Sequence, residues 1–392
     1  MDGSYQLLAA RYLRKQARRL IGQLKGVRQA DDVEYVHQAR VASRRLRAGL
    51  QIFSDCFGRK KLKRWRKHVR RLTEGLGPAR DRDVQIEFVQ GVLAQLDDKL
   101  HRPGVARLLL RLKQSRQLVQ PQVIEVADRF DATKSAKEIL AAAEKMRAQR
   151  KKRSLTLQSP FVFAQADEHV CNRLNELFEY EDCLGDPEDQ EQHHAMRIAG
   201  KRLRYTLEIC QPVYEGRLDK FVKAVKQLQT LLGDIHDCDV WVTDLDTFLE
   251  EERQRTRAYF GHDRSFARLR IGLEHLQQER GARRQELFEQ LAHYWKELDQ
   301  QGLWEELIHN LNSPLKSPEH LEPPTGTSHA EDRRKRKRGP CRRDGKPGPQ
   351  GGDNGRALPT AKESDESAGS NVRQGEQAET LLGADRPGGI GP

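Results

Sequence analysis

One basic motif occurs twice in this chain. Residues 37–47 read His-Gln-Ala-Arg-Val-Ala-Ser-Arg-Arg-Leu-Arg, and residues 194–204 read His-Ala-Met-Arg-Ile-Ala-Gly-Lys-Arg-Leu-Arg. Both copies place a histidine and four cationic residues at the same spacing. The copies start 157 residues apart, at 37 and 194, far beyond the roughly 20 to 50 residues of a solenoid repeat. The repeat therefore predicts two homologous units in one chain.

The similarity continues beyond the motif. A Leu-Gly-x-x-x-Asp-x-Asp-Val segment follows at 76–84 and again at 232–240, and helically spaced apolar residues precede it in both copies. The corresponding apolar pairs are Trp65 and Phe221, Val69 and Val225, Leu72 and Leu228, and Leu76 and Leu232. The duplication therefore includes the following helix as well as the basic motif.

Apolar residues recur with a helical period from about residue 4 to residue 310, and alternating β-branched runs are nearly absent. This pattern predicts an all-α fold. We expect one helical unit over about 5–155 and a second over about 156–310, each a bundle of about four main helices. The expected helices are 4–25, 32–56, 60–76, 82–99, 103–130 (broken at Pro121), 133–152, 161–181, 188–211, 217–232, 238–260, 264–281 and 283–310.

The composition changes near residue 311. Residues 311–392 are rich in Gly, Pro, Ser and charged residues and lack apolar periodicity, so we expect a disordered tail. This tail contains the basic runs 333–338 and 341–343. Such runs are usually solvated, and they can also attach a protein to a polyanion without specificity.

The formal net charge of the chain is +12, which indicates an anionic partner without choosing among nucleic acid, polyphosphate and a membrane surface. The six cysteines include no Cys-x-x-Cys pair, so we expect reduced thiols and neither a zinc site nor a disulfide framework. No stretch of 18 apolar residues and no secretory signal pattern occurs. We therefore expect a soluble, cytoplasmic protein that does not span a membrane.

Both copies of the motif distribute charge in the same way around a helix. The first basic row consists of His37, Arg40, Arg44 and Arg47, and the second basic row consists of His194, Arg197, Lys201 and Arg204. At about 100° per residue each row shares one face, opposite apolar residues such as Leu46 and Leu203. Each row extends over roughly 15 Å, which is long enough to contact several phosphate groups of an extended polyanion.

The helix after each motif adds further cations. In the first copy Lys60, Arg64, Lys67 and Arg71 lie opposite an apolar stripe, and in the second copy Lys220 and Lys223 keep two of these places. Arginine suits an anion site because its planar fork donates two hydrogen bonds to phosphate and stays charged at any cellular pH. Histidine adds a donor that becomes cationic when a nearby phosphate raises its pKa.

The paired aspartates of the Leu-Gly segments have two interpretations. They are Asp81 and Asp83 in the first copy and Asp237 and Asp239 in the second. With His193, His194 and His236, Asp237 is compatible with a metal site of the HD phosphohydrolase type, but Arg80 replaces His236 in the first copy and cannot bind a metal. We favour a structural role, in which the aspartates cap helix N-termini or orient the basic rows by pairing with them.

These segments resemble a known family. The H-x-x-R-x-x-x-R-R-L-R segment at 37–47, the H-x-x-R-x-x-x-K-R-L-R-Y segment at 194–205 and the two Leu-Gly segments are similar to the CHAD domain, the conserved histidine α-helical domain. The resemblance covers about residues 5–305 and includes the duplication. It implies two four-helix bundles related by pseudo-two-fold symmetry, and binding of inorganic polyphosphate in a basic groove lined by both halves, often at polyphosphate granules.

The resemblance also implies which residues bind phosphate. They are His37, Arg40, Arg44, Arg45 and Arg47 in the first half, His194, Arg197, Lys201, Arg202 and Arg204 in the second, and Lys60, Arg64, Lys67, Arg71, Lys220 and Lys223 as groove walls. Many relatives carry an N-terminal triphosphate-tunnel domain marked by an E-x-E-x-K strand. No such motif occurs before residue 5, so we do not expect the activity of that domain.

The sequence thus favours a non-enzymatic polyphosphate-binding protein, with no catalytic residue, metal or cofactor. Two alternatives stay open. One is a metal-dependent phosphohydrolase that uses His193, His194, His236 and Asp237. The other is a nucleic-acid-binding protein, which is less favoured because aromatic residues that could stack on bases are sparse beside the basic rows.

Overall fold

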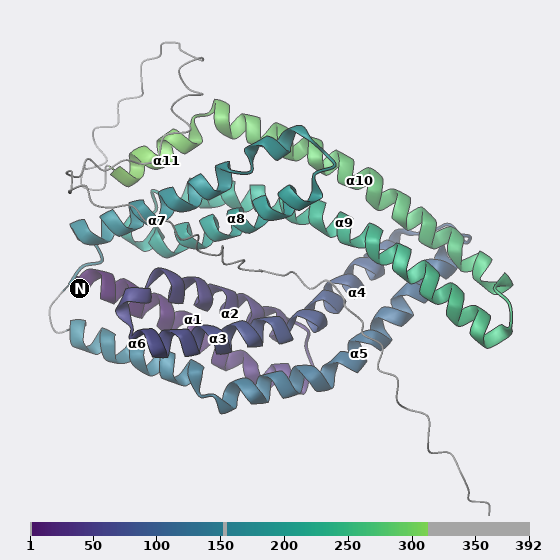
Figure 1. Cartoon of the computed structure of the whole chain (residues 1–392), viewed down its shortest axis with the longest axis horizontal. Coiled ribbons are helices and arrows are strands. Elements are labelled where there is room, and N and C mark those ends of the chain that lie inside the picture. Colours follow the sequence, from purple (N-terminus) through teal and green to yellow (C-terminus); the bar gives the residue numbers. More distant parts are fainter. Residues whose placement is uncertain (1, 152–154, 313–392) are drawn as a thin grey trace, which may run out of the picture. The chain divides into compact units, whose positions relative to one another are not determined.

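The computed structural model describes residues 2–151 and 155–312, and within these ranges the regular structure is entirely helical (Figure 1). The all-α prediction is confirmed. In the first half the helices are α1 (Gly3–Gln29), α2 (Glu34–Ile52), α3 (Arg59–Gly75), α4 (Gly77–Gln95), α5 (Arg102–Ala132) and α6 (Ser135–Lys151). In the second half they are α7 (Pro160–Phe178), α8 (Gln190–Cys210), α9 (Asp219–Phe260), α10 (Ala267–Gln300) and α11 (Leu303–Asn312). Short 3-10 turns lie at Ser54–Cys56, Glu181–Gly185, Gln211–Val213 and Arg264–Phe266.

Two groups of helices pack side by side (Figure 1). The first group contains α1, α2, α3, α6 and the C-terminal part of α5, and the second contains α7, α8, α11 and parts of α9 and α10. The groups meet where α2 contacts α8 and α1 contacts α7. One hydrophobic core runs through both, with Leu13 and Leu46 buried on one side and Leu174 and Leu203 on the other. The apolar stripes read from the sequence therefore supply this core.

A helical arm extends beyond the two groups (Figure 1). It is built from α4, the N-terminal half of α5, the C-terminal half of α9 and the N-terminal half of α10, and it has its own small core around Val105, Trp241 and Leu273. Polar contacts also tie the two halves of the chain together here. The Nε2 of Gln85 on α4 donates to Oδ2 of Asp244 on α9 at 2.7 Å.

Three expected helix breaks are wrong. Helix α5 continues through Pro121, α9 continues through Gly233, and α10 continues past residue 282 to Gln300. In α5, the segments before and after Pro121 both pack firmly, the first in the arm core and the second, with Val123 and Phe130, in the main core. This packing on both sides offsets the hydrogen bond that proline removes.

The two copies of the Leu-Gly segment differ in helix continuity because of one residue. In the first copy Pro78 follows Gly77, and a new helix, α4, begins there with proline in its first turn. In the second copy Asp234 takes the place of Pro78, keeps its backbone N–H, and lies within the unbroken helix α9. The same motif therefore forms a helix junction in one half and the middle of a helix in the other.

The arm depends on a close crossing of α5 and α10 near their N-termini. A Cβ added at Gly272 would lie 1.9 Å from the carbonyl oxygen of His101, and one added at Gly104 would lie 2.1 Å from that of Leu269. Both contacts are with backbone, which cannot move aside as a flexible side chain can. The helices approach this closely because both positions are glycine.

We expect Gly272→Ala to lower the free energy of unfolding by about 1–3 kcal/mol, because the added methyl group overpacks the crossing. Gly281→Ala on the same helix is the matched control, since a Cβ there meets nothing within 4 Å. That change should stabilise the protein by about 0.5–1 kcal/mol through helix propensity. Urea titration followed by circular dichroism measures both values. Equal effects of the two substitutions would contradict the assigned crossing.

Several sequence predictions concern residues that the structure does not describe. The predicted tail, with the basic runs 333–338 and 341–343, lies outside the described residues apart from its first two positions, which end α11. Cys341 lies outside them as well. The five described cysteines form no disulfide with one another, and four of them are buried.

Candidate functional site

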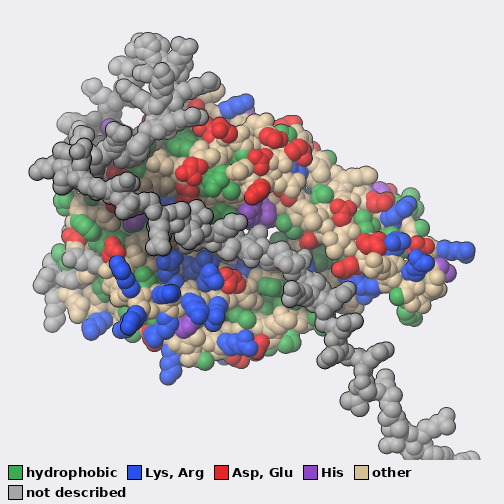
Figure 2. All heavy atoms as spheres, in the orientation of Figure 1, with side chains coloured by type: hydrophobic (Ala, Val, Ile, Leu, Met, Phe, Trp, Pro, Cys, Tyr) green, Lys and Arg blue, Asp and Glu red, His purple; other side chains and the backbone are tan. Residues whose placement is uncertain are grey.

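Helices α2 and α8, which carry the two basic rows, lie against each other where the two groups of helices meet. Each helix buries the apolar side predicted from its sequence, with Leu46 and Leu50 on α2 and Leu203 and Leu207 on α8 fully buried. The basic rows lie on the remaining surface. Figure 2 shows Lys and Arg side chains gathered on the first group of helices and along its boundary with the second, where the surface is hollowed and histidine side chains appear.

The two rows converge in a shared region that we call the seam. Its residues are His37, Arg40, Arg44, Arg80 and Asp81 from the first half, and His194, Arg197, Lys201, His236 and Asp237 from the second. Arg44 of the first row is close enough to Arg197 and Lys201 of the second to perturb the titration of both. The seam is therefore one cationic site with contributions from both repeats.

Lys201 is a strongly perturbed cation of the seam. Burial, together with the positive charges of Arg197 and Arg44, lowers the pKa of Lys201 to about 7, and the smaller opposing effect of Asp237 does not restore it. Burial likewise lowers the pKa of Arg197, whose Nε has no hydrogen-bond partner in the described part of the chain. The free protein thus holds like charges together at an energetic cost that a bound anion would relieve.

Arg40 is fixed by the backbone of the neighbouring helix. Its Nη1 donates to the carbonyl oxygen of Thr73 at 2.6 Å and lies over Gly77, where a Cβ would come within 3.1 Å. Burial and the adjacent Arg44 lower the pKa of Arg40 to about 10. The glycine of the first Leu-Gly segment therefore makes room for the guanidinium group, which stays charged at neutral pH.

The histidine ends of the two rows differ in chemistry. In the second half the Nδ1 atoms of His194 and His236 lie 3.3 Å apart, so one imidazole donates and the other accepts. Burial lowers the pKa of both, and that of His236 falls to about 3 with a further contribution from Arg197. In the first half, where Arg80 replaces His236, burial and then the charge of Arg80 lower the pKa of His37. The first half keeps a permanent charge at this end through Arg80, whereas His194 and His236 in the second half are held toward the neutral form.

The first aspartate of each pair faces the seam. Desolvation raises the pKa of Asp81 and of Asp237, while Arg40 and Arg44 oppose the rise in Asp81 and Arg197 opposes it in Asp237. Asp81 also raises the pKa of Asp237, so the two carboxylates approach each other across the seam. That these two aspartates orient the basic rows stays a prediction.

The second aspartate of each pair forms an internal ion pair. Oδ1 of Asp83 lies 2.6 Å from Nε of Arg116 on α5, and Asp239 pairs with Arg284 on α10. These contacts hold α5 against α4 and α10 against α9. The alternative prediction, that the aspartates cap helix N-termini, is wrong, because all four positions lie inside α4 or α9. The missing break at Gly233 explains the error in the second copy.

The remaining predicted contacts lie away from the centre of the seam. Arg45 and Arg204 contact Glu208, Arg202 pairs with Glu176, and Arg64 pairs with Glu138. Lys60, Lys67 and Arg71 are exposed on α3, on the side opposite its apolar stripe. Arg47 is half-buried on α2. The sequence did not predict Arg80 and His236 as members of the seam, or Glu208 as an ion-pair partner of the arginines. The available signal was that each of these residues occupies an equivalent position in one of the two copies of the repeat.

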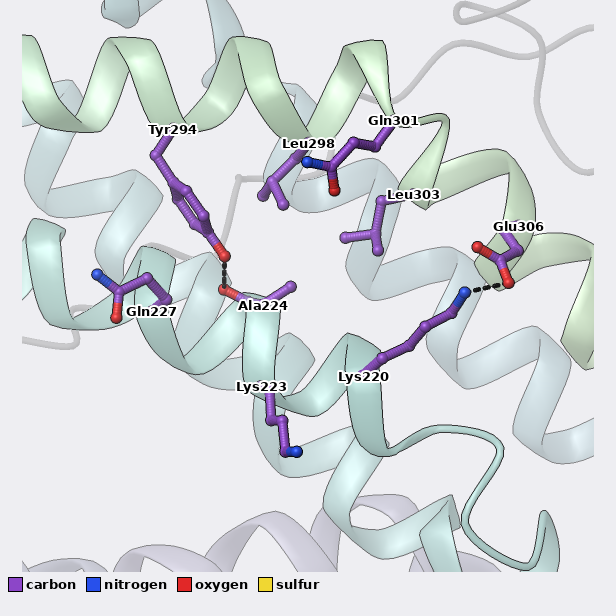
Figure 3. A pocket seen from close by; sticks show the side chains of 9 residues that line it. All are labelled: Lys220, Lys223, Ala224, Gln227, Tyr294, Leu298, Gln301, Leu303 and Glu306. Atoms are coloured by element: carbon purple, nitrogen blue, oxygen red, sulfur yellow. Dashed lines mark hydrogen bonds and ion pairs between the residues drawn. The ribbon is translucent and has the colours of Figure 1, made fainter.

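Lys220 and Lys223 border a different hollow, between α9, α10 and α11 (Figure 3). Lys220 reaches across to pair with Glu306, and Tyr294 donates from its hydroxyl to the carbonyl oxygen of Ala224 at 3.2 Å. Apolar side chains, including Leu298, line the rest. None of the lining residues belongs to the seam, and Lys223 points away from the other labelled side chains of the hollow (Figure 3).

A metal site is the other arrangement that sequence analysis left open. Over residues 2–151 and 155–312, no group of three or more His, Cys, Asp or Glu side chains is placed to hold a metal ion. His193 is buried, with its Nε2 2.9 Å from the carbonyl oxygen of Cys183, and packs on Phe288. It therefore points away from His194 and His236, which would have to share a metal with it.

Comparison with known families identifies the domain. The sequence model of the CHAD domain matches residues 11–246, which include both basic rows and both Leu-Gly segments. The chain belongs to the CHAD domain family. This family is linked to polyphosphate binding. The match ends within α9, so the outer part of the arm and the end of the second group of helices lie beyond the segment matched to the CHAD domain.

Relatives of this CHAD protein include two uncharacterized mycobacterial proteins. Rv2226 of Mycobacterium tuberculosis is 28% identical over 224 residues, covering 53% of this chain and 39% of that protein. MT2285, from a second strain of the same species, has the same identity and coverage. The chain thus spans about two fifths of the length of the curated relatives it matches.

Two solved structures are similar to the CHAD protein. The CHAD domain of the plant Ricinus communis is 21% identical, with a TM-score of 0.47 over 69% of this chain and 91% of that one. PptA from Streptomyces chartreusis is 16% identical, with a TM-score of 0.46 over 73% of this chain and 98% of that one. In the described part of the chain, no helix is long and apolar enough to cross a bilayer.

Proposed function

We propose that this CHAD protein binds inorganic polyphosphate along the seam, without catalysis. The observation that carries the proposal is the convergence of both basic rows, with Arg44 beside Arg197 and Lys201. Repulsion among these cations is unfavourable in the free protein. A polyanion that contacts all of them replaces this repulsion with charge-assisted hydrogen bonds.

Arrangement of the cations supports a chain-like ligand over a single phosphate. Each row extends over roughly 15 Å, so orthophosphate can contact only part of the seam at a time. Each additional phosphate of a chain engages another guanidinium, ammonium or imidazole group. We therefore expect affinity to grow with chain length until the seam is filled.

The same chemistry makes nucleic acid a weaker ligand. Among the exposed large apolar side chains of residues 2–151 and 155–312, the aromatic ones are Phe161, Tyr259 and Phe260, and none belongs to the seam. Base stacking on aromatic platforms supplies much of the affinity for single strands. Without it, DNA would bind only through its phosphates, which are spaced more widely than those of polyphosphate.

A salt-titrated binding assay with long-chain polyphosphate, orthophosphate and single-stranded DNA tests the proposal. Polyphosphate should bind most tightly at physiological salt, and its log affinity should fall linearly with log salt, by analogy with counterion release from nucleic acids. A chain ending at Asn312 should keep this preference if the seam is the site. Equal or tighter binding of DNA, or loss of polyphosphate binding on removal of residues 313–392, would refute it.

A further inference from the structure

The second basic row ends in an acidic residue. Glu208 follows Arg204 by four residues and, at about 100° per residue, falls on the same helical face as Lys201 and Arg204. The equivalent position in the first copy of the repeat is Gln51. One copy thus continues its basic face with a neutral side chain, whereas the other places a carboxylate there.

Glu208 connects the two rows. Its Oε2 lies 2.9 Å from Nη2 of Arg45 on α2, and its Oε1 lies 3.6 Å from Nε of Arg204. The side chains are 20%, 26% and 18% exposed for Glu208, Arg45 and Arg204, so solvent screens these contacts less than it screens an open surface pair. The Nε atoms of both arginines are buried and have no hydrogen-bond partner among the described residues. Glu208 therefore contacts both arginines through ion pairs and leaves these buried Nε donors without a hydrogen bond.

Glu208 has an effect on any phosphate chain that lies along the seam. Beyond Arg44 and Lys201 the chain would meet a carboxylate that repels it and that cancels one of the two positive charges of Arg45 and Arg204. In the opposite direction, toward His37 and His194, the seam offers further cations. The position of Glu208 thus favours the histidine end.

We infer that Glu208 is a specificity-determining residue that ends the phosphate-binding stretch of the seam. It does so as an internal counter-anion that holds Arg45 and Arg204. The inference rests on the proposed function. It implies that Arg45 and Arg204, which the resemblance to the CHAD family gives as phosphate contacts, are withheld from the ligand. It also implies that the first half carries no equivalent stop, because Gln51 is neutral.

Glu208→Gln tests the inference by copying the first repeat. Release of Arg45 and Arg204 should raise the affinity for long-chain polyphosphate about fivefold and steepen the log–log salt dependence by about 1–2, since more phosphates are neutralised. Tripolyphosphate is short enough to remain within the existing stretch, and its affinity should change less than about twofold, because the more distant charge is largely screened. Fluorescence-detected binding at three salt concentrations gives both quantities.

Gln51→Glu is the reciprocal variant, and it keeps the test decisive if Glu208→Gln does not fold. Gln51 is exposed, so the new carboxylate is tolerated. It should lower the affinity for long-chain polyphosphate, whereas the affinity for tripolyphosphate should change by less than about twofold. Glu250→Gln is the matched control: it also releases an arginine, Arg253, but from the arm. It should change neither affinity.

The outcomes separate the inference from the proposed function. If the native protein binds polyphosphate and neither Glu208→Gln nor Gln51→Glu changes the long-chain affinity, Glu208 is only a structural link between α2 and α8. Equal changes for long-chain polyphosphate and tripolyphosphate would also overturn the inference, because they indicate a general charge effect. If the native protein does not bind polyphosphate, the proposed function itself fails.

Discussion

Replacing Arg44 and Lys201 together with glutamate should lower the affinity for long-chain polyphosphate by more than about 100-fold. Hydrogen bonds to charged groups contribute about 1.5–3 kcal/mol each, so losing two of them costs roughly 3–6 kcal/mol before repulsion is counted. These two residues come from different repeats and meet in the centre of the seam. The double variant therefore removes one central cation of each repeat from the shared site.

The matched control reverses one arginine and one lysine elsewhere. Arg268 and Lys296 are exposed on α10 and belong to neither basic row, so Arg268→Glu with Lys296→Glu changes the net charge equally. Gel-shift retention and a far-ultraviolet circular dichroism spectrum should be recorded for both variants. Both variants should keep the helical content of the native protein. Unchanged retention of long-chain polyphosphate by the Arg44→Glu, Lys201→Glu variant would exclude the seam as the binding site.

The direction of each basic row could be predicted from sequence because it depends on local periodicity. Leu46 and Leu203 lie opposite the cations on a helical wheel, and burial of these leucines fixes where the cations point. The duplication further indicated that two such faces exist. Helix type and the buried residues of α3 followed from the same periodicity.

Which cations remain available could not be predicted, because their partners come from distant segments. Arg45 contacts Glu208, Arg64 pairs with Glu138, and Arg202 pairs with Glu176. Arg45 and Arg202 lie beside the basic rows on the helical wheel and Arg64 lies on the next helix, but no local pattern shows which acid meets each of them. Only the packing of α2 on α8, α3 on α6 and α7 on α8 brings the acids to them.

Helix continuity was the other feature of the fold that the local sequence pattern predicted wrongly. Glycine alone did not end α9 at Gly233, whereas the glycine–proline pair at Gly77 and Pro78 coincides with the start of a separate helix, α4. The continuous helix places His236 and Asp237 on one rigid element with the start of the arm. In the second copy this continuity explains why Asp237 and Asp239 do not cap a helix N-terminus.

Polyphosphate binding should weaken as the pH rises above 7, by up to about tenfold per pH unit. In the free protein, burial and the neighbouring cations Arg197 and Arg44 lower the pKa of Lys201 to about 7. Bound phosphate favours the ammonium form and raises that pKa. Binding is therefore strongest where Lys201 is already protonated, below pH 7, and loses affinity between pH 7 and the higher pKa of the complex.

Folding of the free protein responds to pH with the opposite sign, which separates the two effects. The pKa of Lys201 is lower in the folded state than its ordinary value of 10.5, so its contribution to stability falls as the pH drops from about 10.5 to 7. A general loss of structure at high pH would weaken folding and binding together. Opposite trends in urea titrations and binding assays would assign the binding effect to protonation in the seam.

Lys201→Arg should remove most of this dependence between pH 7 and 9, because arginine stays charged there. The substitution copies Arg44, the equivalent residue of the first repeat. Isothermal titration at pH 8 in two buffers with different ionisation enthalpies should show uptake of about one proton for the native protein and almost none for the variant. An equal proton uptake in both would assign the titration to another group and remove Lys201 as its source. His194 and His236, whose pKa values are lowered below 6.5 in the free protein, would then be the residues to replace next.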